Sequence, residues 1–146
     1  RTECMIVVID VNVLLSALIR DSTTREFIVT AGQDFCFPEP SLHKIRKYKE
    51  LILEKSGLSE LEFLVILHTL FRFVRLVPLE EVLRNWDEAK EIMEQIDPED
   101  ATFLATALGQ TNAVIWSDDK HFEKQNRIIT IKTEQMIHLF GHHQST

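Results

Sequence analysis

Short, mostly apolar runs recur along the chain, and each is bounded by polar or turn-forming residues. Runs without a polar–apolar alternation are typical of parallel strands that are buried on both faces. Between these runs, apolar residues recur at helical spacing, so the pattern predicts strands and helices that alternate. We expect strands at 5–9, 35–37, 73–77, 113–116 and 128–131, and helices at 13–19, 23–30, 41–55, 59–70, 79–96, 97–109 and 133–139.

This alternation indicates an α/β fold. We expect a three-layer α/β/α arrangement with a central parallel sheet of about five strands. The 146 residues contain no break in composition, no internal repeat and no linker. We therefore expect one domain at 1–140, followed by a disordered tail at 141–146.

Composition narrows the functional classes. The 16 basic and 23 acidic residues give a net charge of −7, which argues against binding nucleic acid by bulk charge but permits a nuclease whose carboxylates bind cations. The four glycines are too scattered for a dinucleotide fingerprint, a phosphate loop or a nucleophile elbow. Cys4 and Cys36 form no Cys-x-x-Cys pair, so we expect buried thiols in a reducing cytoplasm, and no membrane span is expected.

Three acids fall where a binding site is expected. Asp10 ends the first strand, Asp119 follows the fourth, and Asp100 lies in the first turn of the helix before the fourth strand. Ligands of an open parallel sheet collect beyond the carboxyl ends of its strands, so these carboxylates are expected to converge. Because they repel one another, a bound Mg²⁺ or Mn²⁺ ion would relieve the repulsion.

Each acid also has a purely structural explanation. Asp97 and Asp100 flank Pro98 as N-cap and third-position acids of a helix, so capping explains both. Either Asp118 or Asp119 is placed to cap a short helix at 121–124, and Asp10 to bind the turn that follows it. Asn12 and Ser117 fit ordinary turn residues.

Motifs in these same segments resemble the PIN-domain family. The segment Val7-Val8-Ile9-Asp10-Val11-Asn12 is similar to its opening strand and Asp-x-Asn motif. The alanine-rich helix after Asp97-Pro98-Glu99-Asp100, and the segment Trp116-Ser117-Asp118-Asp119-Lys120-His121-Phe122, resemble the later motifs in the same order. The resemblance covers about residues 5–140 and is strongest to prokaryotic, VapC-like toxin components.

The resemblance implies a metal-dependent ribonuclease that hydrolyses phosphodiesters with Mg²⁺ or Mn²⁺. Asp10, Asp100 and Asp119 match the family's metal-binding and catalytic acids, and Asn12 and Ser117 match its supporting polar positions. RNA is the implied substrate, and an antitoxin protein or a second copy of the chain is the implied protein partner.

The chain also departs from the family pattern. Lys44 stands in Leu42-His43-Lys44-Ile45 where the family has its second acid, and His121 stands where a further aspartate is common. A lysine ammonium at that place would replace part of the metal charge, so we expect one ion rather than two, or an empty site. The run of Lys44, Arg46, Lys47 and Lys49 is either a solvated helix face or a guide for the RNA backbone.

Two other functional classes remain open. A catalytically weak or inactive PIN module that binds RNA or protein would explain the missing acid. A receiver-type phosphorylation switch is a further small, acidic α/β domain, but the strand ends at Val77-Pro78 and Ile131-Lys132 do not supply its phosphoacceptor aspartate and lysine.

Overall fold

The fold was analysed in a computed structural model that describes residues 5–19 and 22–141. The strands are β1 (Ile6–Ile9), β2 (Asp34–Pro38), β3 (Val74–Val77), β4 (Ala113–Trp116) and β5 (Ile129–Ile131). The α-helices are α1 (Val11–Ile19), α2 (Ser22–Thr30), α3 (Leu42–Lys47), α4 (Lys49–Ser56), α5 (Glu60–Leu70), α6 (Leu79–Leu83), α7 (Trp86–Met93), α8 (Ala101–Leu108) and α9 (Thr133–Phe140). Short 3-10 helices span η1 (Glu39–Ser41), η2 (Pro98–Asp100) and η3 (Lys120–Lys124). Residues 142–146 of the tail expected at 141–146 lie outside the described residues, as does Cys4.

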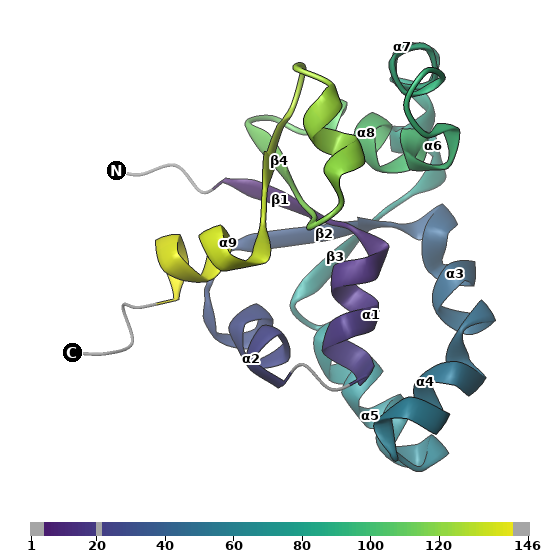
Figure 1. The fold of residues 1–146 in the computed structure, drawn as a ribbon, viewed down its shortest axis with the longest axis vertical. Coiled ribbons are helices and arrows are strands. Elements are labelled where there is room, and N and C mark those ends of the chain that lie inside the picture. Colours follow the sequence, from purple (N-terminus) through teal and green to yellow (C-terminus); the bar gives the residue numbers. More distant parts are fainter. Residues whose placement is uncertain (1–4, 20–21, 142–146) are drawn as a thin grey trace.

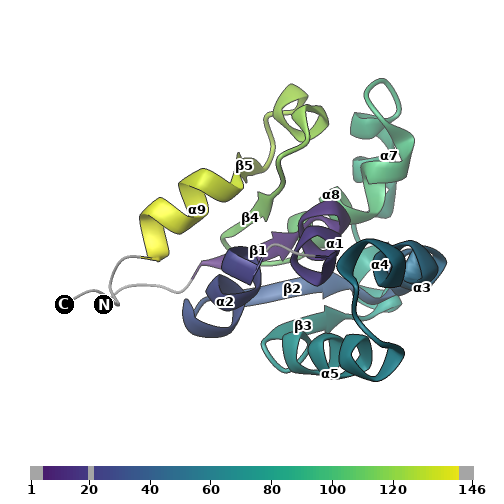
Figure 2. The ribbon, with the colours of Figure 1, turned by 60° about the horizontal axis from the view of Figure 1, so that its bottom comes forward.

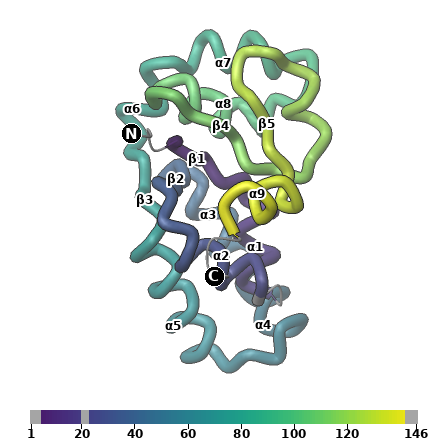
Figure 3. The backbone as a smooth tube through the Cα atoms, turned by 90° about the vertical axis from the view of Figure 1, so that its left-hand side faces the viewer, coloured from purple at the N-terminus to yellow at the C-terminus, as the bar shows by residue number. Residues whose placement is uncertain are grey.

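The strands form one parallel sheet in the order β3-β2-β1-β4-β5. Figure 3 shows this order across the sheet, with α7 and the α4–α5 pair at opposite ends of the molecule. The helices cover both faces: α6, α7 and α8 lie on one side of the strands, and α1, α2, α4 and α5 on the other (Figures 1 and 2). The expected three-layer α/β fold is therefore confirmed. Within the described residues, no helix is long and apolar enough to cross a membrane.

The strand order creates a switch point between β1 and β4. From β1 the chain builds outwards through β2 and β3, and it then returns to the other side of β1 to build β4 and β5. Connections therefore leave β1 and β4 in opposite directions, which opens a crevice at their carboxyl ends. Ile9 pairs with Trp116, so the residues that follow them start this crevice side by side.

Two expected helices are each divided. The segment expected as one helix at 41–55 forms α3 and α4, with Tyr48 between them in a non-helical conformation. The turn brings α4 against α1. The segment expected as one helix at 79–96 forms α6 and α7, because the chain bends before Trp86 and both pieces pack on α8. Apolar spacing continues across both bends, so the sequence pattern does not reveal them.

The core lies on both faces of the sheet. Trp116 is fully buried and packs edge-to-face with Phe27 and in a tilted arrangement with Phe35, at ring-centroid distances of 5.5 Å and 5.8 Å. Its Nε1–H donates to Thr133 Oγ1 at 2.8 Å, which ties β4 to the start of α9. Cys36 is buried as expected, and burial raises the pKa of its thiol to about 12.

Candidate metal centre

Asp10 is the innermost carboxylate of the crevice. It directly follows β1, and its backbone carbonyl accepts hydrogen bonds from Val13 N–H and Leu14 N–H, which begin α1. Only 3% of the residue is exposed. An acid at this depth needs polar partners, because desolvation strongly disfavours its charged form.

Ser117 supplies that partner from the neighbouring strand. Its hydroxyl donates to Asp10 Oδ2 at 2.7 Å and accepts from Asp119 N–H at 3.0 Å. The side chain of Asp119 in turn accepts from His121 N–H at 2.9 Å and caps η3. One buried hydroxyl therefore couples Asp10 to the loop after β4, and the capping explanation of Asp119 is confirmed.

Asp97 and Asp100 enter the crevice from the turn between α7 and α8. Asp97 Oδ1 accepts from Glu99 N–H at 3.1 Å, as expected of a capping residue, while its Oδ2 remains available to the crevice. Asp100 makes no side-chain capping bond, so capping does not explain this acid. Its side chain is 14% exposed, and its Oδ2 is buried without a hydrogen-bond partner among the described residues.

His121 connects these acids with Asp119. Its Nδ1 lies 3.1 Å from Asp97 Oδ2, 3.5 Å from Asp100 Oδ2 and 3.2 Å from Asp119 Oδ1. Despite these short distances, Nδ1 takes part in no hydrogen bond with the residues that the structure describes. Ligand atoms of Asp97, Asp100 and His121 all lie within 4.8 Å of one another, close enough to bind one ion.

Burial and neighbouring carboxylates raise the pKa values of Asp10 and Asp100. Burial, followed by the charges of Asp10, Asp97 and Asp119, raises the pKa of Asp100 to about 7. Burial also raises the pKa of Asp10, against the opposing effect of the Ser117 hydrogen bond. Two carboxyl groups that resist ionisation in one crevice indicate a deficit of positive charge, which a cation would supply.

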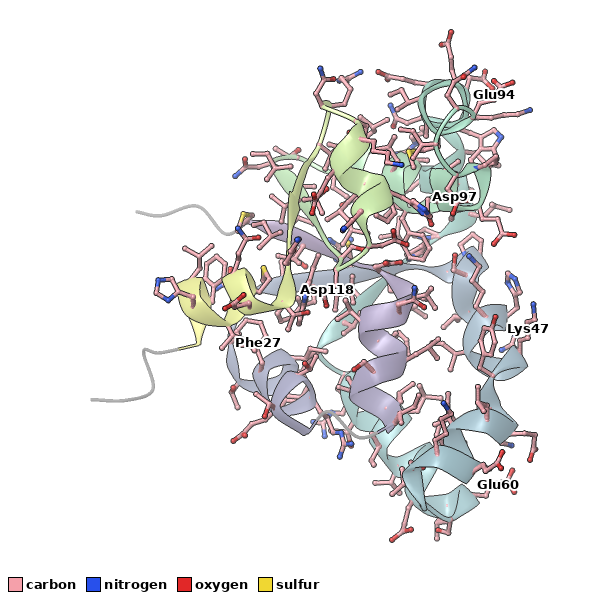
Figure 4. All side chains as sticks on the ribbon, viewed as in Figure 1. Phe27, Lys47, Glu60, Glu94, Asp97 and Asp118 are labelled. Carbon is pink, nitrogen blue, oxygen red and sulfur yellow. The ribbon has the colours of Figure 1, made fainter. Side chains whose placement is uncertain are left out.

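The crevice opens into a cavity of about 540 Å³. Figure 4 shows Asp97 on the α7 side and Lys47 on α3, across the carboxyl ends of the strands from each other. Lys44 lies on the α3 side with its Nζ 5.5 Å from the centre of the Phe103 ring, and its charge slightly lowers the pKa of Asp10. The residues of the predicted site that line this cavity are Asp10, Asn12, Lys44, Lys47, Asp100 and Asp119.

Other members of the basic run lie elsewhere. Arg46 is exposed and does not line the cavity, and Lys49 forms an ion pair with Glu60 of α5. The structure therefore brings half of the predicted RNA-binding run to the acidic crevice. Helical spacing explains the division, because residues at successive positions of α3 point in different directions.

Two residues of the centre were not selected from the sequence. Asp97 was explained by capping alone, yet it caps with one oxygen and faces His121 with the other. His121 was noted only as a departure from the family pattern. The sequence did offer a clue to His121. It lies two residues after Asp119, where the family often has an aspartate, and a histidine at such a position can also bind a metal.

Comparison with known proteins agrees with the fold described above. The sequence profile described as the PIN domain matches residues 8–139. The chain belongs to the PIN domain family. A solved structure of similar fold is VapBC2 from Rickettsia felis, bound to a DNA fragment from its promoter. The alignment has a TM-score of 0.65 and 15% identity, and it covers 88% of this chain and 98% of that chain. No curated protein sequence matches this PIN domain at a significant level.

The centre fits the divalent ion that PIN domains use. Oxygen atoms of several acids face one crevice, and Asp100 Oδ2 and His121 Nδ1 are buried there without hydrogen bonds among the described residues. Buried polar atoms of this kind are costly unless something else satisfies them. A cation bound between them would do so.

Proposed function

We propose that this PIN domain is a metal-dependent ribonuclease of the toxin–antitoxin type, which hydrolyses phosphodiester bonds in RNA. The observation that carries the proposal is the convergence of Asp10, Asp97, Asp100 and Asp119 on one cavity at the switch point of the sheet. This is where open parallel sheets bind ligands. The membership of the PIN family supplies the reaction class.

Three of these acids have tasks in the proposed reaction. Asp100 and Asp119, whose side-chain oxygens lie 3.5 Å and 3.2 Å from His121 Nδ1, would hold the ion. Asp10, held at the floor of the crevice by the Ser117 hydroxyl, orients the attacking water. A bound Mg²⁺ or Mn²⁺ lowers the pKa of a water ligand and offsets charge on the phosphoryl oxygens.

The α3 wall provides the contacts for a nucleic-acid backbone. Lys44 and Lys47 line the cavity opposite the acids, and Tyr48 beside them presents a ring that is 39% exposed. Lysines neutralise phosphates, and an exposed aromatic ring stacks on bases of a single strand. Local positive charge therefore guides the substrate although the chain as a whole carries −7. An antitoxin, or a second copy of the chain, stays a prediction.

A second function has one specific observation in its favour. Lys44 occupies the cavity wall at the position of the family's second acid, and its ammonium charge already acts on Asp10. If this charge displaces the ion, the domain binds RNA or a protein partner without cleaving RNA. Metal-stimulated cleavage separates the two functions.

The decisive experiment measures cleavage of single-stranded RNA with Mg²⁺, with Mn²⁺ and with excess chelator. We expect cleavage that requires the ion and is abolished by Asp10→Asn. The matched control is Asp118→Asn, because Asp118 is an exposed acid next to Asp119 that accepts hydrogen bonds from Thr133 and does not line the cavity. Activity in chelator, or in Asp10→Asn, would refute the mechanism. Circular dichroism verifies that both variants are folded.

A further inference from the structure

The histidine of the centre changes the chemistry of its ligand set. PIN-type sites built from acids offer oxygen alone, which suits Mg²⁺. Here the compact group is Asp97, Asp100 and His121, two carboxylates and one imidazole nitrogen. Imidazole binds transition metals well, whereas Mg²⁺ strongly prefers oxygen.

The separations in this group are those of ligands around one ion. Nδ1 of His121 is 3.1 Å from Asp97 Oδ2 and 3.5 Å from Asp100 Oδ2. Neighbouring ligands of an ion that holds them at ~2.1 Å lie ~3 Å apart. The nitrogen makes no hydrogen bond with any described residue, and the same is true of Asp100 Oδ2. A protonated imidazole would pair with these carboxylates as an ion pair, whereas a neutral imidazole leaves its nitrogen free to bind a cation.

The backbone holds these ligands in place. Asp97 Oδ1 is bound to Glu99 N–H, and Asp100 N–H donates to Asp97 O at 3.0 Å, so both acids belong to one tight turn. His121 N–H is bound to Asp119, and the next residue, Phe122, is fully buried. Ligands that are oriented by fixed neighbours lose little freedom when an ion binds.

We propose that Asp97, Asp100 and His121 form a mixed nitrogen–oxygen site that selects Mn²⁺, or another divalent transition metal, over Mg²⁺. The inference rests on the proposed function, in which the crevice holds a divalent ion. It adds the identity of that ion and assigns direct ligands to Asp97 and His121. A histidine in place of a carboxylate removes one negative charge, which weakens the electrostatic attraction for either ion, but the bond to imidazole compensates for this loss with Mn²⁺ and not with Mg²⁺.

The test compares wild type with His121→Asp, which restores an all-oxygen set. Protein freed of metal by chelation is titrated with MnCl₂ and with MgCl₂ by calorimetry. We expect His121→Asp to lower the ratio of Mn²⁺ to Mg²⁺ affinity by about tenfold or more. Pulsed electron paramagnetic resonance of bound Mn²⁺ should show nitrogen modulation from imidazole in wild type and lose it in the variant.

His43→Asp is the matched control. His43 lines the same cavity, is exposed and lies outside the compact group, so this variant adds the same charge without replacing a proposed ligand. We expect it to keep the wild-type metal ratio and the nitrogen modulation. An equal change of the ratio in both variants would overturn the inference, because it would then be a general effect of charge.

The remaining outcomes separate this inference from the proposed function. If Mn²⁺ binds wild type without nitrogen modulation, or the ratio is unchanged in His121→Asp, the metal selection is wrong while a nuclease using acids alone stands. If wild type binds neither ion and His121→Asp binds Mg²⁺, His121 is an internal counter-ion and the inference fails. If no variant binds either ion, the inference and the proposed function fail together.

Discussion

Asp100→Asn should stabilise the metal-free protein while it weakens metal binding. Asp100 is nearly buried beside three other carboxylates, and its pKa rises from 3.8 to about 7. Above pH 7 the folded protein must therefore keep a charge that its surroundings oppose. Asparagine has nearly the same shape and removes that charge.

The size of the effect follows from the pKa. A rise of about 3 units, from 3.8 to about 7, corresponds to at most about 4 kcal/mol at a pH above both values. Because the acids titrate together, and the amide makes its own imperfect contacts, we expect a gain of about 1–3 kcal/mol at pH 8. For a chain of this length, that is a rise in Tm of roughly 2–12 °C.

The sign depends on pH. A carboxyl group whose pKa is raised in the folded state stabilises the fold fully below its unfolded value of 3.8, and this contribution is lost as pH rises through about 7. The advantage of Asp100→Asn over wild type should therefore be small at pH 4 and grow steadily to pH 8. Chemical denaturation in the presence of chelator at several pH values measures it.

Glu99→Gln is the matched control. Glu99 is the adjacent acid, lines the same cavity and is exposed, so its neutralisation should change the unfolding free energy by less than about 0.5 kcal/mol. A variant Asp100→Asn that is no more stable than wild type at pH 8, or that gains equally at pH 4, would refute the electrostatic reasoning. In the presence of Mn²⁺ the order should reverse, because wild type gains stability from the bound ion.

Two further variants test the supporting residues. Lys44→Glu should tighten divalent-ion binding by about tenfold in calorimetry, because it replaces a positive charge at the cavity wall with a ligand oxygen. Lys47→Glu, at an exposed position on the same wall, is the control. An unchanged affinity in Lys44→Glu would show that Lys44 is a surface residue only. Ser117→Ala should lose about 1–3 kcal/mol of unfolding free energy, because Asp10 then loses its buried hydroxyl partner. Ser16→Ala, an exposed serine of α1, should lose far less, and equal losses would contradict the role of the buried hydrogen bond.

The sequence by itself predicted the strands, most of the helices and a candidate site at the carboxyl ends of the strands. Apolar runs without alternation gave parallel strands, since burial on both faces leaves no polar side. Acids at or just beyond the ends of such strands, Asp10 and Asp119, indicated a binding edge. Both inferences depend on local order and on rules of sheet construction, which a single sequence carries.

Only the tertiary structure decided which atoms meet. Lys44 and Lys47 of α3 line the cavity, whereas Lys49, which follows the bend at Tyr48, pairs with Glu60, although all three lie in one basic run. Asp97 has the local pattern of a capping residue and does cap, yet its second oxygen faces His121, 24 positions further along the chain. Such contacts depend on how the α7–α8 turn packs against the loop after β4. The residue pattern of each segment does not predict this packing, because the packing arises from the order in which the strands join the sheet.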